Sequence, residues 1–155
     1  MSLSKKIIDL SEKMRPVLVK VVPMKLLRYM KDKVQERELK RMQNRRRKPY
    51  EPGHYEPGIN LIGCIRAEIG LGQSCRLLAD ELEHTGISYM IRDFLLDGKL
   101  RAEEHSWDHK IEEQPRYGIN LLHIEPLDLI MAYMKEEPEL WDYRYNIAFW
   151  LWELE

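Results

Sequence analysis

Short apolar blocks recur along the second part of the chain and predict a sheet of strands joined by helices. Four of these blocks have the length of a strand that is buried on both faces: 59–65, 87–91, 119–124 and 145–150. Leucines at helical spacing in 75–84 and apolar residues in 127–135 predict helices between them. Strands separated by crossovers favour an α/β fold, with an open parallel sheet of about four strands and flanking helices.

Residues 1–48 follow a helical pattern instead. Apolar residues fall on one face of a helix that starts after Pro23, at Leu26, Leu27, Met30 and Val34. The segment holds 16 Lys and Arg against 5 Asp and Glu, and it ends in four consecutive bases: Arg45, Arg46, Arg47 and Lys48. Residues 49–155 hold 9 Lys and Arg against 21 Asp and Glu. We therefore expect a basic amphipathic helical segment attached to an acidic domain.

Three roles fit this basic segment. It can dock on an anionic membrane surface, where each Lys or Arg near the lipid contributes about 1 kcal/mol. It can equally pack as a solvated helix on the acidic part of the same chain. A nucleic-acid-binding arm is the least favoured role, because no aromatic residue is interleaved with the bases at 45–48 and no known reader motif follows.

A linker separates the two parts. Glu-Pro-Gly occurs twice within residues 49–58, which prevents a helix and favours turns. The predicted organisation is therefore a helical segment at 1–48, a linker at 49–58 and an α/β domain at 59–155.

The composition narrows the class of protein. With 44% hydrophobic and 33% charged residues the chain is expected to fold. Cys64 and Cys75, its two cysteines, give no disulfide framework and no zinc spacing, so neither a metal nor an oxidising compartment is expected. No apolar run has the length of a signal peptide or a membrane span. These features favour a cytoplasmic protein, peripheral on the inner membrane face if the basic segment binds lipid.

A glycine-rich stretch follows the first predicted strand. Gly70 and Gly72 precede Ser74, which stands where a helix N-cap is expected. A strand, a glycine loop and a helix in this order are typical of Rossmann-like sheets, and they direct backbone N–H groups at a phosphate or carboxylate. The dinucleotide fingerprint is incomplete because Cys75 replaces its third glycine, and the P-loop ending is missing. A plain glycine turn is the alternative interpretation.

Other polar residues are expected at the same edge of a parallel sheet, because ligands bind at the carboxyl ends of its strands. Arg66 can hold a phosphate or carboxylate, unless it pairs locally with Glu68. His123 can act as a base or bind a sugar hydroxyl, and the alternative is a structural histidine. Glu153 follows two tryptophans that can pack on a sugar ring or simply fill the core.

Three ordered blocks resemble the start of bacterial family 4 (group 1) glycosyltransferases, which have the two-domain GT-B fold, and the match spans roughly residues 57 to 155, about two thirds of the chain. They are Gly-Ile-Asn-Leu-Ile-Gly with the glycine stretch at 58–76, Tyr-Gly-Ile-Asn-Leu-Leu-His-Ile at 117–124, and Tyr-Asn-Ile-Ala-Phe-Trp-Leu-Trp-Glu at 145–153. The resemblance implies an incomplete N-terminal GT-B domain that binds a glycan or lipid-linked acceptor. It also implies that Gly70, Gly72 and Ser74 face the donor diphosphate, with Arg66, Glu68, His123 and Glu153 near the cleft.

The resemblance has further consequences. These enzymes generally use no metal or cofactor, and the nucleotide sugar is their substrate. The family continues after the third block with a donor-binding domain, so we expect this chain to act only with a separate C-terminal domain. The aromatic residues after Ile147 are then expected to be exposed, and self-association is possible. Alternatives are a noncatalytic membrane-binding module and, less favoured because of Cys75, a nicotinamide-dependent oxidoreductase.

Overall fold

The computed structural model describes residues 23–44, 47–94, 101–135 and 138–151. The chain divides into two compact units, one of residues 1–46 with 133–137 and one of residues 47–132 with 138–155. The first unit contains the long helix α2, Met24–Asn44, which was predicted to begin after Pro23. Arg45, Arg46 and Glu153 lie outside the described residues, as does the N-terminal part of the basic segment.

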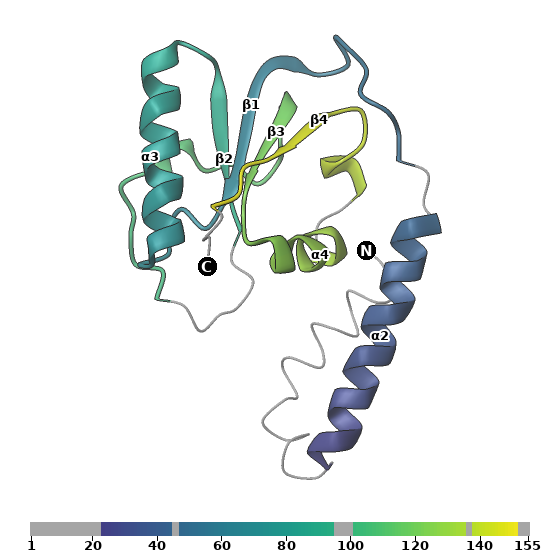
Figure 1. The fold of residues 1–155 in the computed structure, drawn as a ribbon. Coiled ribbons are helices and arrows are strands. Elements are labelled where there is room, and N and C mark those ends of the chain that lie inside the picture. Colours follow the sequence, from purple (N-terminus) through teal and green to yellow (C-terminus); the bar gives the residue numbers. More distant parts are fainter. Residues whose placement is uncertain (1–22, 45–46, 95–100, 136–137, 152–155) are drawn as a thin grey trace. The chain divides into compact units, whose positions relative to one another are not determined.

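The second unit is an α/β domain with a four-stranded parallel sheet in the order β2-β1-β3-β4 (Figure 1). This confirms the predicted fold class. The strands are β1 Glu56–Gly63, β2 Tyr89–Asp93, β3 Tyr117–His123 and β4 Tyr145–Ala148. The helices are α3 Gly70–Thr85 and α4 Pro126–Lys135, with short 3-10 turns η1 Asp108–Lys110 and η2 Pro138–Leu140.

The first strand starts earlier than the sequence predicted, inside the proposed linker. Glu56 pairs with Tyr117, and the pairing is irregular between Glu56 and Ile59. Gly58 makes this possible, because its φ of 149° and its contact with Ser88 and Tyr117 leave no room for a side chain.

The sheet has the topology of a doubly wound fold. Beyond β2, Ile111 forms an isolated parallel bridge with Ile91, and Glu112 N donates to Ile91 O at 3.0 Å. With this bridge as a minimal outer strand, the chain first moves outward from β1 and then returns to β3 on its other side. The strand order therefore reverses between β1 and β3, and such a switch point is where open α/β sheets bind ligands.

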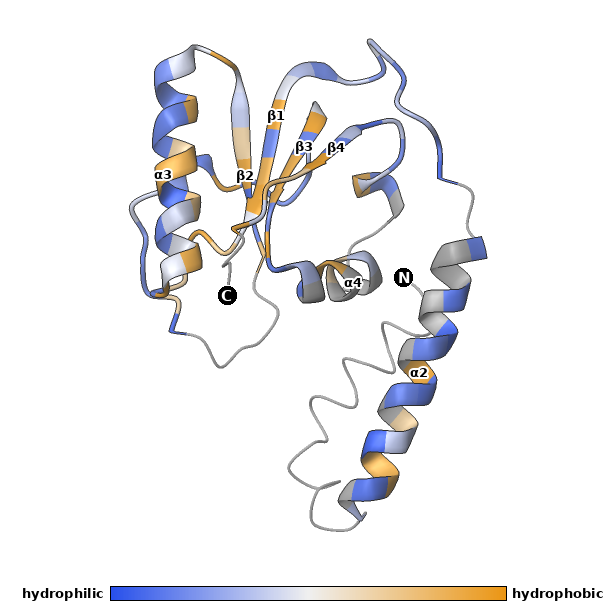
Figure 2. Cartoon of the chain, viewed as in Figure 1, coloured by the Kyte–Doolittle hydropathy of each residue, from blue (hydrophilic) through white to orange (hydrophobic). Residues whose placement is uncertain are grey.

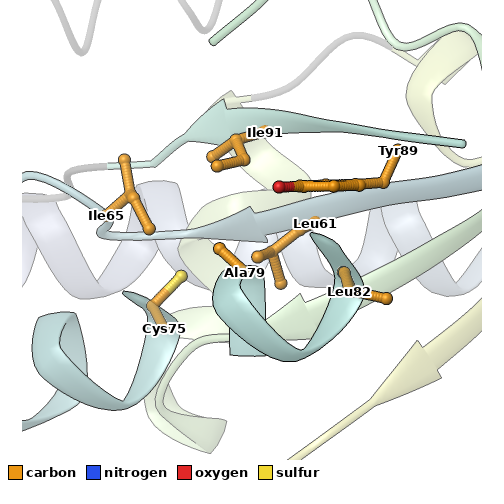
Figure 3. Close-up of a cluster of buried hydrophobic side chains, with 7 residues drawn as sticks. All are labelled: Leu61, Ile65, Cys75, Ala79, Leu82, Tyr89 and Ile91. Carbon is orange, nitrogen blue, oxygen red and sulfur yellow. The ribbon is translucent and has the colours of Figure 1, made fainter. Parts of the chain in front are cut away.

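One face of the sheet is buried under α3. Leu61 and Ile91 on the strands pack against Cys75, Ala79 and Leu82 on the helix (Figure 3). Burying an aliphatic side chain of this size contributes about 1.5–3 kcal/mol. This cluster holds α3 in a fixed position on the sheet, and it therefore also fixes the place where α3 begins.

A ladder of asparagines crosses the opposite face, with Asn60 and Asn120 buried and Asn146 exposed. Asn60, Asn120 and Asn146 are in register on β1, β3 and β4. Asn60 Nδ2 donates to Asn120 Oδ1 at 2.8 Å, and Asn120 Nδ2 donates to Asn146 Oδ1 at 2.7 Å. Asn120 Nδ2 also donates to Leu140 O at 2.7 Å, which joins the ladder to η2. Each of the three blocks that carry the family resemblance contributes one member, so part of that resemblance reflects the construction of the sheet.

A buried arginine closes the amino-terminal side of this face. Arg144 donates from Nε to Tyr117 O at 2.8 Å and from Nη2 to Pro115 O at 2.9 Å, and its guanidinium lies 3.6 Å from the centre of the Tyr55 ring. Burial lowers the pKa of Arg144. The backbone carbonyls and the Tyr55 ring stabilise the buried cation in place of water. Arg144 therefore links the segments that precede β1, β3 and β4.

Hydropathy follows this architecture. Figure 2 shows hydrophobic colour along the strands, whereas α2 is mainly hydrophilic with separate hydrophobic bands. In the part of the chain that the structure describes, none of the helices has the length and apolar character needed to cross a bilayer.

Candidate functional site

The candidate site lies at the carboxyl edge of the sheet, beside the switch point. Gly63, Asp93 and His123 end β1, β2 and β3 and are in register with one another. A side chain at position 63 would meet Cys75 of α3, so this row is on the α3 face. Asp93 and His123 therefore lie on either side of a glycine, under the start of α3.

The helix α3 begins directly above this row. Its first residue is Gly70, its N-cap is Ile69, and the first N–H within α3 to bond a backbone carbonyl is that of Gln73, which donates to Ile69 O at 3.0 Å. The amides of the first turn have no intrahelical acceptors, so they carry the positive end of the helix dipole. Gly70 is exposed and Leu71 is half-buried. This turn can therefore present bare N–H groups to an anion.

The expected glycine loop is corrected by this geometry. Gly70, Gly72 and Ser74 lie within α3, and Ser74 is not the N-cap. The helix starts earlier because Gly72 fits against the preceding turn, where an added Cβ would lie 2.1 Å from Ala67 O. Ser74 was predicted as the N-cap from its residue type, but the close approach at Gly72 places the N-cap five residues earlier, at Ile69.

Arg66 pairs with two carboxylates and not with Glu68. Its Nε donates to Asp108 Oδ1 at 2.7 Å, and its Nη1 lies 3.7 Å from Asp93 Oδ2. The hydrogen bond from Arg66 lowers the pKa of Asp108 below its ordinary value. Arg66 is two-thirds buried, so its guanidinium is positioned by these partners at the edge of the site.

Glu68 pairs with Arg101 instead. Arg101 Nε lies 3.3 Å from Glu68 Oε1, and Glu68 N donates to Arg101 O at 2.9 Å. Glu104 N also donates to Arg66 O at 3.3 Å. The segment 101–108 therefore runs along the turn between β1 and α3 and holds both of its charged side chains.

Asp93 is a carboxylate that is largely buried at the edge of the site. Its side chain is 12% exposed, and Oδ1 is buried with no hydrogen-bond partner among the described residues. Burial raises the pKa of Asp93, and the nearby Arg66 partly opposes this. A buried carboxylate oxygen without a donor can accept a hydrogen bond from a ligand hydroxyl or amide.

His123 is fully buried at the end of β3. Its Nδ1 lies 3.1 Å from Phe149 O, and its ring is 5.4 Å from that of Phe149. A proton on Nδ1 that donates to the carbonyl leaves Nε2 as an acceptor, and Nε2 has no partner among the described residues. His123 therefore contacts the chain that follows β4, as the alternative of a structural histidine implies, and its role toward a substrate stays a prediction.

The two thiols at the edge are structural. Cys64 and Cys75 are both buried and free. Burial raises the pKa of Cys75 to about 12 and raises that of Cys64 as well. Because the thiolate is the reactive form, neither side chain is an activated nucleophile at neutral pH.

The structure thus brings most of the predicted residues to one edge. Arg66, Glu68 and the first turn of α3 are adjacent in the chain, and His123 joins them through its register with Gly63. The sequence analysis missed three further residues that hold this edge: Asp108, Arg101 and Arg76. Arg76 Nη1 donates to Ile65 O at 2.8 Å and to Ala67 O at 3.0 Å. No local pattern identifies Asp108 or Arg101, since each acts on a residue more than thirty positions earlier.

Beyond β3, an apolar strip borders the site. Tyr145, Ile147, Phe149, Trp150 and Leu151 are all exposed, and β4 is the outer strand of the sheet. The sequence contains no charged residue between 145 and 151. The expected exposure of this apolar segment is confirmed for the residues that the structure describes.

Comparison with models of protein families, with curated proteins and with solved structures finds no match.

Proposed function

We propose that this chain is the acceptor-side part of a glycosyltransferase that transfers a sugar from a nucleotide sugar to a cell-surface glycan or glycolipid. One observation carries the proposal: α3 begins at the exposed Gly70, with first-turn amides that have no intrahelical acceptor, at the carboxyl end of β1 and beside the switch point. The resemblance of the three sequence blocks to family 4 glycosyltransferases supports the same assignment.

The first turn of α3 faces the donor diphosphate in this proposal. Gly70 lets a phosphate oxygen approach the backbone closely, because no side chain covers the turn at that position. Gly72 and Ser74 shape the turn from within the helix. No cofactor is needed, since the nucleotide sugar is itself the substrate.

The charged side chains at this edge already have partners within the chain, and for this reason the proposal includes a separate C-terminal domain. Arg66 is already neutralised by Asp108 and Asp93, and Glu68 by Arg101. The helix terminus alone contributes only about 0.3–1 kcal/mol toward binding an anion. Diphosphate affinity for this chain is therefore expected to be weak, with a dissociation constant well above about 1 mM, because 1 mM already requires about 4 kcal/mol. The groups that grip the nucleotide must be supplied by a separate C-terminal domain.

His123 acts as a positioning residue here. It is fully buried and bonds the backbone at Phe149, so it fixes the place where the exposed aromatic residues begin. Trp150 and Phe149 then offer apolar surfaces of the kind that pack against sugar rings or a lipid-linked acceptor.

The proposal is tested by supplying a separately produced donor-binding domain of a two-domain glycosyltransferase and measuring sugar transfer from a panel of nucleotide sugars. Gly70→Asp is the decisive variant. Its side chain meets nothing within 4 Å, and a carboxylate at a helix N-terminus stabilises the helix. The fold should therefore survive, whereas the diphosphate is repelled and transfer falls at least about a hundredfold.

Gly70→Ala is the matched control, because it adds a Cβ without charge. Transfer with Gly70→Ala should fall by a smaller factor than with Gly70→Asp, because the added Cβ hinders the close approach of the phosphate but does not repel its charge. Equal transfer by Gly70→Asp and Gly70→Ala, or no transfer with any nucleotide sugar, would contradict the assignment.

A further inference from the structure

The helix α2 carries an apolar line on its surface. Leu26, Met30 and Val34 are spaced four residues apart. Leu27 lies on the same side of the helix, three residues before Met30 and seven before Val34. Leu26 is 49% exposed and Met30 is 55% exposed, and the neighbouring Tyr29 is 60% exposed. Leu27 and Val34 are half-buried. Exposed apolar residues on consecutive turns of one helix mark an interaction surface.

Charge is distributed unevenly around the same helix. Lys33 and Arg37 are exposed and lie within about 60° of Met30, at 100° per residue. Asp32 and Glu36 lie about 200° and 240° around the helix from Met30. Glu36 is paired with Lys40 at 2.8 Å. The apolar line is therefore bordered by Lys33 and Arg37 on one side. The carboxylates of Asp32 and Glu36 are on the far side of the helix, together with the exposed Lys25 and Arg28.

We propose that this face of α2 docks on an anionic lipid surface. The apolar line supplies side chains that enter the boundary between headgroups and acyl chains, and the bases beside it contact the anionic headgroups. Stable attachment of a helix lying in the interface needs both of these contributions. Four consecutive bases, 45–48, follow α2 in the sequence.

A lipid surface fits this face better than a nucleic acid does. Nucleic acids are bound by basic side chains with polar or aromatic partners, and they offer no site for the exposed Leu26 and Met30 side chains. The proposal concerns only the unit that contains α2. It does not depend on sugar transfer or on the site at the edge of the sheet.

The test is co-sedimentation of the full chain with phosphatidylcholine vesicles that contain, or lack, about 30% phosphatidylglycerol. The chain should bind the anionic vesicles and not the neutral ones. Leu26→Gln with Met30→Gln keeps charge and helix propensity and should weaken binding at least about tenfold. Lys33→Gln with Arg37→Gln should weaken it about fivefold per residue.

Asp32→Asn is the matched control on the opposite side of α2, and it should bind at least as well as the original chain. Amide hydrogen exchange in residues 24–44 should slow when anionic vesicles are added. Equal binding by the Leu26 and Met30 double variant and the original chain would overturn the proposal. The proposal would also be overturned if these amides were protected without vesicles and the chain did not sediment with them. Tighter binding to duplex DNA than to anionic vesicles would overturn it as well.

Discussion

A substitution of Gly72 separates the two interpretations of the glycine stretch most clearly. In the structure, a Cβ at this position would lie 2.1 Å from Ala67 O and 3.0 Å from Cys64 O. Both contacts are with backbone atoms, which cannot rotate away as a side chain can. Gly72→Ala must therefore move the start of α3 away from the turn that follows β1.

The magnitude follows from opposing effects. Overpacking of a tight site costs about 1–3 kcal/mol, and displacing Ala67 O also weakens the bond that it accepts from Arg76, which contributes about 1.5–3 kcal/mol. Replacing a helical glycine by alanine returns up to about 1 kcal/mol. The net effect of Gly72→Ala should be a loss of about 3 kcal/mol in the free energy of unfolding.

Gly70→Ala is the control, because its Cβ meets nothing within 4 Å. This variant should be unchanged or more stable by up to about 1 kcal/mol. Urea unfolding followed by tryptophan fluorescence measures both variants, and the melting temperature of Gly72→Ala should fall by about 10 °C or more. Equal stability of the two variants would refute the packing role of Gly72 and return the stretch to a simple flexible turn.

Four further results are expected. Asn120→Leu removes the centre of the asparagine ladder and should lower the free energy of unfolding by about 2–4 kcal/mol in urea titrations, because Leu140 O and Asn60 Nδ2 lose a bond. Cys75 is neutral in the folded state up to about pH 12 but ionises near pH 9.0 when unfolded, so stability should fall as the pH rises across this range, and less so in Cys75→Ala. Asp93→Asn should raise the melting temperature, because it removes a buried charge whose pKa is raised by burial. Ile147→Lys should reduce concentration-dependent light scattering, if the exposed edge of β4 drives self-association.

The fold was predictable because its signals are local. Apolar runs of strand length and leucines at helical spacing identified all four strands and both helices of the sheet unit, with shifts of a few residues at their ends. The shifts have specific causes, such as the close contact of Gly58 with Ser88 and Tyr117, which lets β1 begin at Glu56. Such contacts between distant segments leave no trace in the local pattern.

The site was predictable only in part, because some of its contacts join residues that are far apart in the sequence. The rule that ligands bind at the carboxyl ends of parallel strands placed Arg66 and His123 correctly at one edge. It did not reveal that Asp108 would hold Arg66, because the two residues are 42 positions apart. The asparagines of the three sequence blocks looked like part of a family signature. In the structure their side chains form hydrogen bonds that join neighbouring strands.

The central claim is that the first turn of α3 receives a diphosphate, and backbone amide chemical shifts test it most directly. Pyrophosphate titrated into the 15N-labelled chain should shift the amide signals of Gly70, Leu71 and Gly72 in a saturable manner, with a dissociation constant well above about 1 mM. The same signals should not respond in Gly70→Asp. Shifts confined to the basic helix α2, with the α3 amides unmoved at saturating pyrophosphate, would contradict the account.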